Sequence, residues 1–568
     1  MSFKALSLLC ISLGLFFQIS LGAVHYKFNV EYMLRRPDCE EHIVMGINGQ
    51  FPAPTIRAEV GDTLDIALTN KLFTEGTVLH WHGITQYGTP WADGTPSISQ
   101  CAINPGETFH YRFKVDRPGT YIYHGHYGMQ RAAGLYGSLI VDLPMGQNEP
   151  FHYDSELNLL LSDWWHTSAQ EQQAQLSSIP NRWVGPPQSF LINGRGQYNC
   201  SLAASLINTT LPQCKFEGGE ECAPQILHVD PNKTYRIRIA SSTSLANLNF
   251  AIANHKMVVV EADGNYEEPF IVDDLDIYSG ETYSVIITTN ENPNQNYWIS
   301  VGFIGENLKT PQALTILNYK ENNASVFPTS PPPITPQWDD YNRSKIFSQK
   351  ILARKGTPRP PIYYDRRLLL LNTESLVDGR TMYAINNVTL ILPSTPYLVS
   401  IKYKLDDAFD QKSPPDNFSF DYDIYNSPVY PNSNTGSGIY MFQLNQVVDV
   451  VLQNTNILER IKRSDFHPWH LHGHDFWILG YGDGMFKPGD DETKFNLENP
   501  PLRNNAVLFP YGWTALRFKA NNPGVWAFHC HVEPHLHMGM GVVFAEAVEN
   551  VEGIPWETLA CGLFRGIS

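Results

Sequence analysis

One run near the C-terminal end of the chain constrains how the rest can fold: His529, Cys530 and His531, followed by His535 and Met540. In an extended segment successive side chains point to opposite faces, so Cys530 lies on one face and both flanking imidazoles lie on the other. Cys530, His535 and Met540 supply three of the four ligands of a blue-copper electron-transfer site. The run therefore predicts two metal sites that share consecutive residues.

The missing imidazole lies upstream, at His467 in the stretch His-Pro-Trp-His-Leu-His. If this stretch is extended, His470 and His472 share one face and His467 lies on the other, which is the parity found around Cys530. Two further His-x-His pairs stand near the N-terminus. The paired histidines are then His80, His82, His124, His126, His470, His472, His529 and His531.

Chance and zinc are the alternatives to a copper site. Random placement of 19 histidines in 568 residues gives about 0.6 His-x-His pairs, whereas the chain has six. A zinc site needs no cysteine between two histidines and no methionine further along the chain, so the pattern favours copper.

These segments resemble the four copper motifs of the multicopper oxidases. The matching motifs are His80-Trp-His-Gly, His124-Gly-His, His467-Pro-Trp-His-Leu-His, and His529-Cys-His with His535 and Met540. Over nearly the whole mature chain, including residues 91–95, 500–504 and 535–544, the resemblance is greatest to the plant L-ascorbate oxidases.

The resemblance implies four copper ions per chain, one of type 1, one of type 2 and two of type 3. The type 1 ligands would be His467, Cys530, His535 and the axial Met540. The type 2 ligands would be His80 and His470, and the type 3 ligands would be His82, His124, His126, His472, His529 and His531.

The same resemblance implies a reaction that takes single electrons from L-ascorbate and reduces dioxygen to water with four of them. Electrons would pass from Cys530 to His529 and His531. Asp93 and Glu533 resemble carboxylates near the cluster in this family, and each is either a proton carrier or a structural hydrogen-bond acceptor.

The reductant would stack between Trp183 and Tyr383 beside the imidazole of His535, again by resemblance. Tyr383 stands where these enzymes usually have Trp, which leaves the physiological reductant open. A laccase-type oxidase of phenols or a metal oxidase with the same copper sites is the nearer alternative. A non-catalytic wall protein is the more distant one, and the filled ligand positions disfavour it.

A weak threefold repeat divides the chain. Alternating segments at 60–70, 229–239 and 446–454 each precede a second such segment, at 105–113, 279–287 and 511–518. Period-two alternation, Gly and Pro punctuation and scarce helical periodicity predict three β-sandwiches. By resemblance these are tandem Greek-key domains of the cupredoxin type, at 23–149, 150–364 and 365–568. A Pro-rich stretch at 328–361 predicts the linker into the third domain.

The repeats differ in the ligands that they carry. Aligning residues 124–126 on 529–531 places Gly125 at the Cys530 position, Gln130 at the His535 position and Leu135 at the Met540 position. The first domain should thus hold cluster ligands but no blue-copper site, and the middle domain should hold none. His166, His228 and His255 of the middle domain are expected to be ordinary structural residues. His474 and His537 are expected to support the ligands from behind or to lie on the surface.

Features outside the repeats predict a secreted protein. Residues 1–22 have the pattern of a cleaved secretory leader, and seven Asn-x-Ser/Thr sequons follow. Without Cys10 and Cys530, six cysteines remain, which allows fifteen pairings. The family resemblance implies Cys39 with Cys222, Cys101 with Cys561, and Cys200 with Cys214.

The net charge of −17 makes nucleic acid an improbable partner. The same sign would repel an anionic reductant at long range, although salt screens this beyond about 10 Å. The expected partners are L-ascorbate and dioxygen. No membrane anchor is expected, the protein should lie in the cell wall space, and a homodimer is one open oligomeric state.

Overall fold

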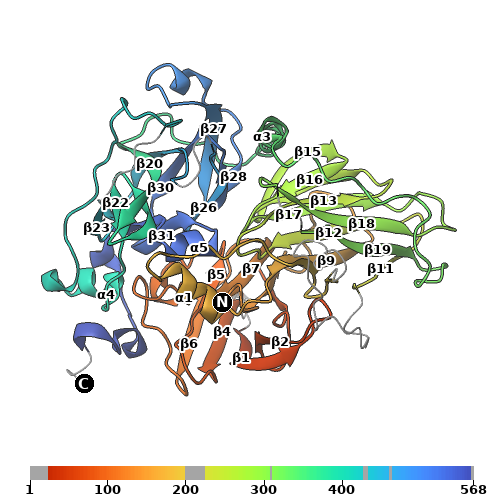
Figure 1. Ribbon diagram of the computed structural model, residues 1–568, viewed down its shortest axis with the longest axis horizontal. Helices are drawn as coiled ribbons and strands as arrows, with labels where there is room; N and C mark the ends of the chain where they lie inside the picture. The colour runs from red at the N-terminus through yellow and green to blue at the C-terminus, as the bar shows by residue number, and fades with distance from the viewer. Residues whose placement is uncertain (1–22, 199–223, 308–309, 427–432, 459–462, 565–568) are drawn as a thin grey trace, which may run out of the picture.

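The computed structural model describes residues 23–198, 224–307, 310–426, 433–458 and 463–564, which form three β-sandwiches (Figure 1). The predicted leader, residues 1–22, lies outside the described residues. The predicted all-β class with three sandwiches is confirmed.

The first sandwich pairs two four-stranded sheets. The predicted alternation is confirmed in two strands, 63–70 and 108–114, where every second side chain is buried. One sheet has the order β2-β1-β4-β6, from β1 (Ala23–Arg35), β2 (His42–Ile47), β4 (Thr63–Asn70) and β6 (Thr108–Lys114). The other has the order β3-β8-β7-β5, from β3 (Ile56–Glu59), β5 (Leu79–His82), β7 (Gly119–Gly125) and β8 (Tyr136–Asp142).

The second sandwich has its own core and pairs a six-stranded sheet with a five-stranded one. The larger sheet, β10-β9-β12-β17-β14-β15, contains β9 (Ser155–Trp164), β10 (Ser189–Ile192), β12 (Thr234–Ser241), β14 (Met257–Ala262), β15 (Asn265–Val272) and β17 (Thr282–Thr288). The smaller, β11-β19-β18-β13-β16, contains β11 (Leu227–Val229), β13 (Asn247–Ile252), β16 (Asp274–Ile277), β18 (Tyr297–Ile304) and β19 (Ala313–Tyr319).

The third sandwich pairs an eight-stranded sheet with a five-stranded one. The larger, β23-β22-β21-β20-β25-β30-β27-β28, contains β20 (Arg366–Val377), β21 (Arg380–Ile385), β22 (Val388–Leu390), β23 (Asn434–Gly436), β25 (Gln446–Gln453), β27 (Phe476–Asp483), β28 (Leu502–Arg503) and β30 (Gly512–Ala520). The smaller, β24-β32-β31-β26-β29, contains β24 (Ile439–Phe442), β26 (His467–Leu471), β29 (Asn505–Leu508), β31 (Gly524–Cys530) and β32 (Gly541–Glu546).

Short helices fill the connections. They are α1 (Ala169–Leu176), α3 (Tyr341–Lys350), α4 (Tyr397–Lys402), α5 (Glu533–His537), and the 3-10 turns η1 (Pro90–Ala92), η3 (Asp406–Ala408), η4 (Asp491–Lys494), η5 (Val548–Asn550), η6 (Trp556–Leu559) and η7 (Gly562–Phe564). The predicted linker is not wholly extended, because α3 forms within it. The Asp340 side chain caps this helix by accepting from Arg343 N at 3.1 Å. In Figure 1, α3 lies between the second and third sandwiches.

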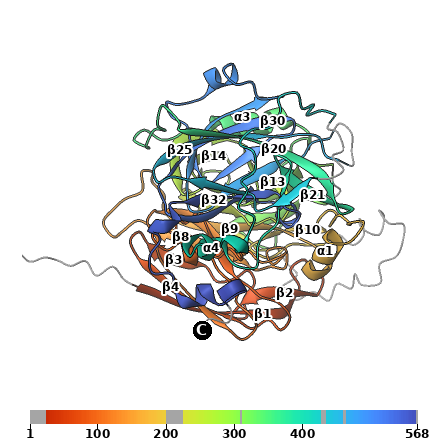
Figure 2. The same ribbon diagram turned by 90° about the vertical axis from the view of Figure 1, so that its left-hand side faces the viewer.

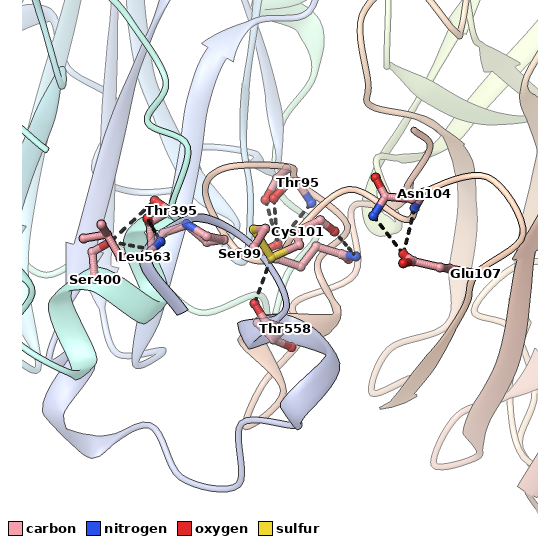
Figure 3. Close-up of a disulfide and its surroundings, with 12 residues drawn as sticks. Thr95, Ser99, Cys101, Asn104, Glu107, Thr395, Ser400, Thr558 and Leu563 are labelled. Atoms are coloured by element: carbon pink, nitrogen blue, oxygen red, sulfur yellow. Dashed lines mark hydrogen bonds between the residues drawn. A yellow bond between two sulfur atoms is a disulfide. The ribbon is translucent and has the colours of Figure 1, made fainter. Parts of the chain in front are cut away.

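The C-terminal turns return to the first sandwich (Figure 2). A disulfide joins Cys101 to Cys561 there, as predicted (Figure 3). Cys39 is also disulfide-bonded. Because Cys200, Cys214 and Cys222 lie outside the described residues, the other two pairings stay predictions.

Candidate metal centre

The predicted blue-copper residues meet at one end of the third sandwich. Cys530 ends β31, and His467 begins β26, which pairs antiparallel with β31. His535 lies in α5, just after that strand. The Cys530 Sγ lies 3.5 Å from His535 Nδ1 and 3.8 Å from His467 Nδ1, and the two Nδ1 atoms are 3.3 Å apart. Met540 is fully buried in the same core cluster.

The chemistry of this donor set fits copper. Burial lowers the pKa of His467 to about 3 and lowers the pKa of His535 well below its ordinary value, so both rings are neutral and keep a lone pair. Burial raises the pKa of the Cys530 thiol, and a bound cation would reverse this by stabilising the thiolate. A thiolate with two imidazoles and a nearby thioether is the ligand set of type 1 copper.

The eight paired imidazoles converge where the first sandwich faces the third. In Figure 1, β5 and β7 of the first sandwich lie beside β31 and α5 of the third. The rings approach through their Nε2 atoms, at 3.4 Å for His80 and His470, 3.4 Å for His126 and His529, 3.0 Å for His472 and His529, and 3.3 Å for His124 and His531.

Contacts of the other ring nitrogen fix which atom faces the centre. The Nδ1 atoms of His80, His124, His470 and His529 lie 2.8 to 2.9 Å from main-chain carbonyl oxygens. An Nδ1–H that donates to a carbonyl leaves Nε2 with only a lone pair. Facing lone pairs at these separations repel one another unless a cation lies between them. The residues therefore fit metal ions held between facing Nε2 atoms.

His82 is turned the other way. Its Nε2 contacts the Asn505 side-chain amide at 2.9 Å, and its Nδ1 is buried with no hydrogen-bond partner. Burial lowers the pKa of His82 well below its ordinary value, so the ring is neutral, and the tautomer with its proton on Nε2 has a free lone pair on Nδ1. This orphaned nitrogen is a second, independent sign that the cluster is built around metal.

Asp93 touches the histidine cluster directly. Its Oδ2 lies 2.9 Å from His472 Nδ1, and its Oδ1 lies 3.3 Å from His80 Nδ1. The side chain is fully buried, and the Thr95 hydroxyl donates to Oδ2 at 3.0 Å. Asp93 thus holds two imidazoles that belong to different sandwiches.

Glu533 lies at the junction of all three sandwiches. Its carboxylate accepts from Arg131 N at 2.9 Å, from Ala132 N at 2.8 Å and from the Ser244 hydroxyl at 2.6 Å. Burial raises the pKa of Glu533. It also lines a cavity of about 20 Å³ beside His124, His126, His529 and His531.

Two contacts to the cluster have no signal in the sequence. The Arg131 guanidinium lies 2.8 Å from His531 Nδ1 and 2.9 Å from its Nε2, and the Ser279 hydroxyl lies 2.9 Å from Nδ1. Ser279 belongs to the second sandwich, which is predicted to hold no metal ligands. These residues lie hundreds of positions from His531 in the chain, so only folding brings them together.

A pocket of about 530 Å³ opens beside the blue-copper residues, and Trp183, Tyr383 and His535 line it. The Trp183 ring centre lies 5.6 Å from that of His535, and the Tyr383 ring centre lies 4.6 Å from it. The two aromatic walls differ, because Trp183 is 43% exposed whereas Tyr383 is 3% exposed. Trp183 is therefore the accessible wall of the pocket.

The five histidines that were expected to have other roles have other partners. His474 pairs with Glu546 at 3.2 Å, and Ser177 contacts His537 at 2.9 Å. His228 contacts Asn318, and His255 contacts Tyr319 and the carbonyl of Ala253. His166 pairs with Asp38 at 2.8 Å.

Comparisons with known proteins agree with this geometry. Three family models described as multicopper oxidase match residues 29–146, 155–322 and 405–550. The chain is 62% identical to the L-ascorbate oxidase of Cucumis sativus, over 98% of this chain and 96% of that protein. It is 64% identical to the L-ascorbate oxidase of Nicotiana tabacum, over 95% and 93% of the two chains.

More distant proteins share the fold. Laccase-12 of Arabidopsis thaliana is 30% identical over 94% of this chain and 95% of its own. The crystal structure of Fet3p, a multicopper oxidase that functions in iron import, superposes with a TM-score of 0.76 at 26% identity, covering 95% of this chain and 94% of that one.

Proposed function

The chain belongs to the multicopper oxidase family, and from this premise we propose that it oxidises L-ascorbate in single-electron steps and reduces dioxygen to water with four electrons. The observation that carries the substrate is the identity of 61% and 64% to the Brassica rapa and Nicotiana tabacum L-ascorbate oxidases, against 30% to Laccase-12. The aromatic pocket beside His535 supports the same reductant.

The proposal includes four coppers per chain, divided as the family motifs imply. The type 1 ligands are His467, Cys530, His535 and Met540. The type 2 ligands are His80 and His470, and the type 3 ligands are His82, His124, His126, His472, His529 and His531. Bound copper supplies one-electron redox chemistry and the capacity to deliver four electrons to one dioxygen.

The chain itself joins the two donor sets. Cys530 faces the blue-copper side, while His529 and His531, one peptide away on either side, face the cluster. This gives the shortest covalent path between the two sets. Consecutive residues can serve the two donor sets because successive side chains of an extended strand point to opposite faces.

The reductant end is formed by three side chains. Trp183 offers an exposed ring for stacking on the flat ring of ascorbate, and Tyr383 packs on His535 from the buried side. The His535 ring lines the pocket and also contributes Nδ1 to the blue-copper set. The ring thus bridges the bound reductant and the donor set.

Asp93 and Glu533 are the two carboxylates proposed for proton supply, and they have different surroundings. Asp93 accepts from His472 Nδ1 and is the carboxylate in contact with the cluster, so it holds or passes a proton there. Glu533 lines the small cavity beside the type 3 ligands, and Arg131, Ala132 and Ser244 fix its orientation.

The protein is further proposed to be a secreted glycoprotein of the cell wall space, with domains at 23–149, 150–364 and 365–568. The Cys101–Cys561 disulfide supports an oxidising compartment. Five sequon asparagines lie in described parts of the chain and all are exposed: Asn232, Asn323, Asn342, Asn387 and Asn417. Among the described residues, no helix has the length and apolarity needed to cross a membrane. A homodimer stays a prediction.

Dioxygen uptake by the purified, copper-loaded protein tests the proposal. Ascorbate, catechol and ferrous iron are compared side by side, and copper is counted per chain. We expect four coppers and the highest kcat/KM with ascorbate. A higher kcat/KM with catechol would make the protein a laccase-type oxidase, and a higher value with ferrous iron would make it a metal oxidase.

A further inference from the structure

A second kind of donor cluster contains none of the proposed copper ligands. It consists of Asp38, in the connection from β1 to β2, His42, at the start of β2, and His166, just after β9. One donor atom from each lies within 4.8 Å of the others. Five trios in the described residues meet this limit, and the other four are made of the proposed copper ligands.

Two buried polar atoms of this cluster have no hydrogen-bond partner. Asp38 is fully buried, and its Oδ1 has no hydrogen-bond partner. The Nε2 of His42 is also buried without a partner. A buried carboxylate oxygen and a buried imidazole nitrogen each cost free energy when left unpaired, so two in one cluster require an explanation.

Surrounding groups hold these donors in place. The Ser189 hydroxyl donates to Asp38 Oδ2 at 2.7 Å, and Gln188 Oε1 accepts from His166 N at 2.8 Å. The rings of His42 and His166 stack with centres 4.6 Å apart. Outer contacts of this kind orient the ligands in known metal sites.

We propose that Asp38, His42 and His166 bind one divalent zinc ion, which joins the β1–β2 connection of the first sandwich to the start of the α1 segment in the second. Two imidazoles and a carboxylate are a zinc donor set, and tetrahedral ligands at zinc distances lie about 3.3 Å apart. Asp38 Oδ2 and His166 Nε2 are 2.8 Å apart, so a small outward shift of these two side chains brings them to the ligand spacing of zinc. His166 is partly exposed, with 24% of its side chain accessible, which leaves the site open to solution and a water as fourth ligand.

The test measures zinc in the copper-loaded protein. Wild-type protein is dialysed against buffered zinc and then against metal-free buffer, and zinc and copper are counted by mass spectrometry. His42→Phe keeps the ring that stacks on His166 but removes the donor nitrogen. His110→Ala removes an exposed histidine of β6 and is the matched control.

We expect one zinc per chain in the wild type and in His110→Ala, none in His42→Phe, and an unchanged copper count in all three. Zinc should also raise the melting temperature of the wild type but not that of His42→Phe. Asp38→Asn, which keeps the shape of the carboxylate, should weaken zinc binding as well.

Three results would overturn the assignment. The first is no retained zinc in the wild type, which would make the trio an ordinary hydrogen-bonded contact. The second is equal zinc in His42→Phe, and the third is zinc retained at the expense of copper, which would place it in the copper centre.

Discussion

The first and third sandwiches have equivalent pairs of strands that carry different groups on one of their faces. In the first, β5 pairs with β7 in the register His80↔His124, and in the third, β26 pairs with β31 in the register His470↔His529. Both strand pairs present histidines to the shared cluster. On the opposite face the third sandwich gathers a thiolate and two imidazoles, whereas the first has none of them.

The first sandwich has filled the equivalent space with ordinary packing. The matching register puts Thr77 at the His467 position, and the Thr77 hydroxyl donates to Gln130 Oε1 at 2.8 Å, with Gln130 at the His535 position. A Cβ on Gly125 would lie 2.8 Å from Gln130 Cβ and 2.9 Å from a Leu135 methyl. A neutral hydrogen-bonded pair and a leucine thus take the place of the metal site.

The largest expected effect comes from removing the group that most distinguishes the two regions. Cys530→Ser replaces the soft thiolate with a hydroxyl, so the blue absorption should vanish and oxidation of every reductant should fall to background. The cluster histidines remain, so copper should fall from four to three per chain. A variant that stays blue would refute the assignment of Cys530.

Gly125→Ala tests the packing that takes the place of the metal site in the first sandwich. The added methyl meets Gln130 and Leu135, and overpacking of this kind costs about 1 to 3 kcal/mol. We expect a lower melting temperature with the blue band intact. Gly480→Ala is the control, since a Cβ there meets its nearest atom at 3.9 Å. Equal melting temperatures of the two variants would contradict a filled site around Gly125.

The two regions also show how far the sequence could lead. Strand alternation alone predicts that Cys530 and its flanking histidines point to opposite faces. Aligning the repeats also identified Gly125, Gln130 and Leu135 as the equivalents of Cys530, His535 and Met540. The Thr77–Gln130 hydrogen bond could not be predicted, because it depends on the register between β5 and β7.

Contacts between sandwiches were equally hidden. Arg131 and Ser279 reach His531 from the other two sandwiches, and no local pattern marks either residue. From the sequence, Trp183 and Tyr383 were expected to stack on the reductant in the same way, although Trp183 is exposed and Tyr383 is buried. Burial depends on how the second and third sandwiches meet. It is therefore a tertiary property that residue types and spacing do not encode.

Met540→Leu sharpens the comparison, because leucine is the residue that the first sandwich has at this position. A weak axial thioether lowers the potential of a blue copper, so its loss should raise the potential while the blue band persists. Redox titration followed by absorbance measures the shift. An unchanged or lower potential would count against an axial role for Met540.

The smallest expected effect tests whether electrons enter only at the third sandwich. His535 lines the aromatic pocket, whereas the buried side chain of its counterpart Gln130 is hydrogen-bonded to Thr77 and to the carbonyl of Gly76. If ascorbate stacks on Trp183, then Trp183→Ala should remove about 0.5 to 1.5 kcal/mol of binding, a loss of about two- to twelvefold in kcat/KM for ascorbate. The blue band should not change. Ferrocyanide, which offers no flat ring to stack, should be oxidised at the normal rate, and Gln130→Ala should leave ascorbate kinetics unaltered. Equal losses with both reductants would mean that Trp183 supports the copper site rather than the substrate, and no loss with ascorbate would place its binding elsewhere.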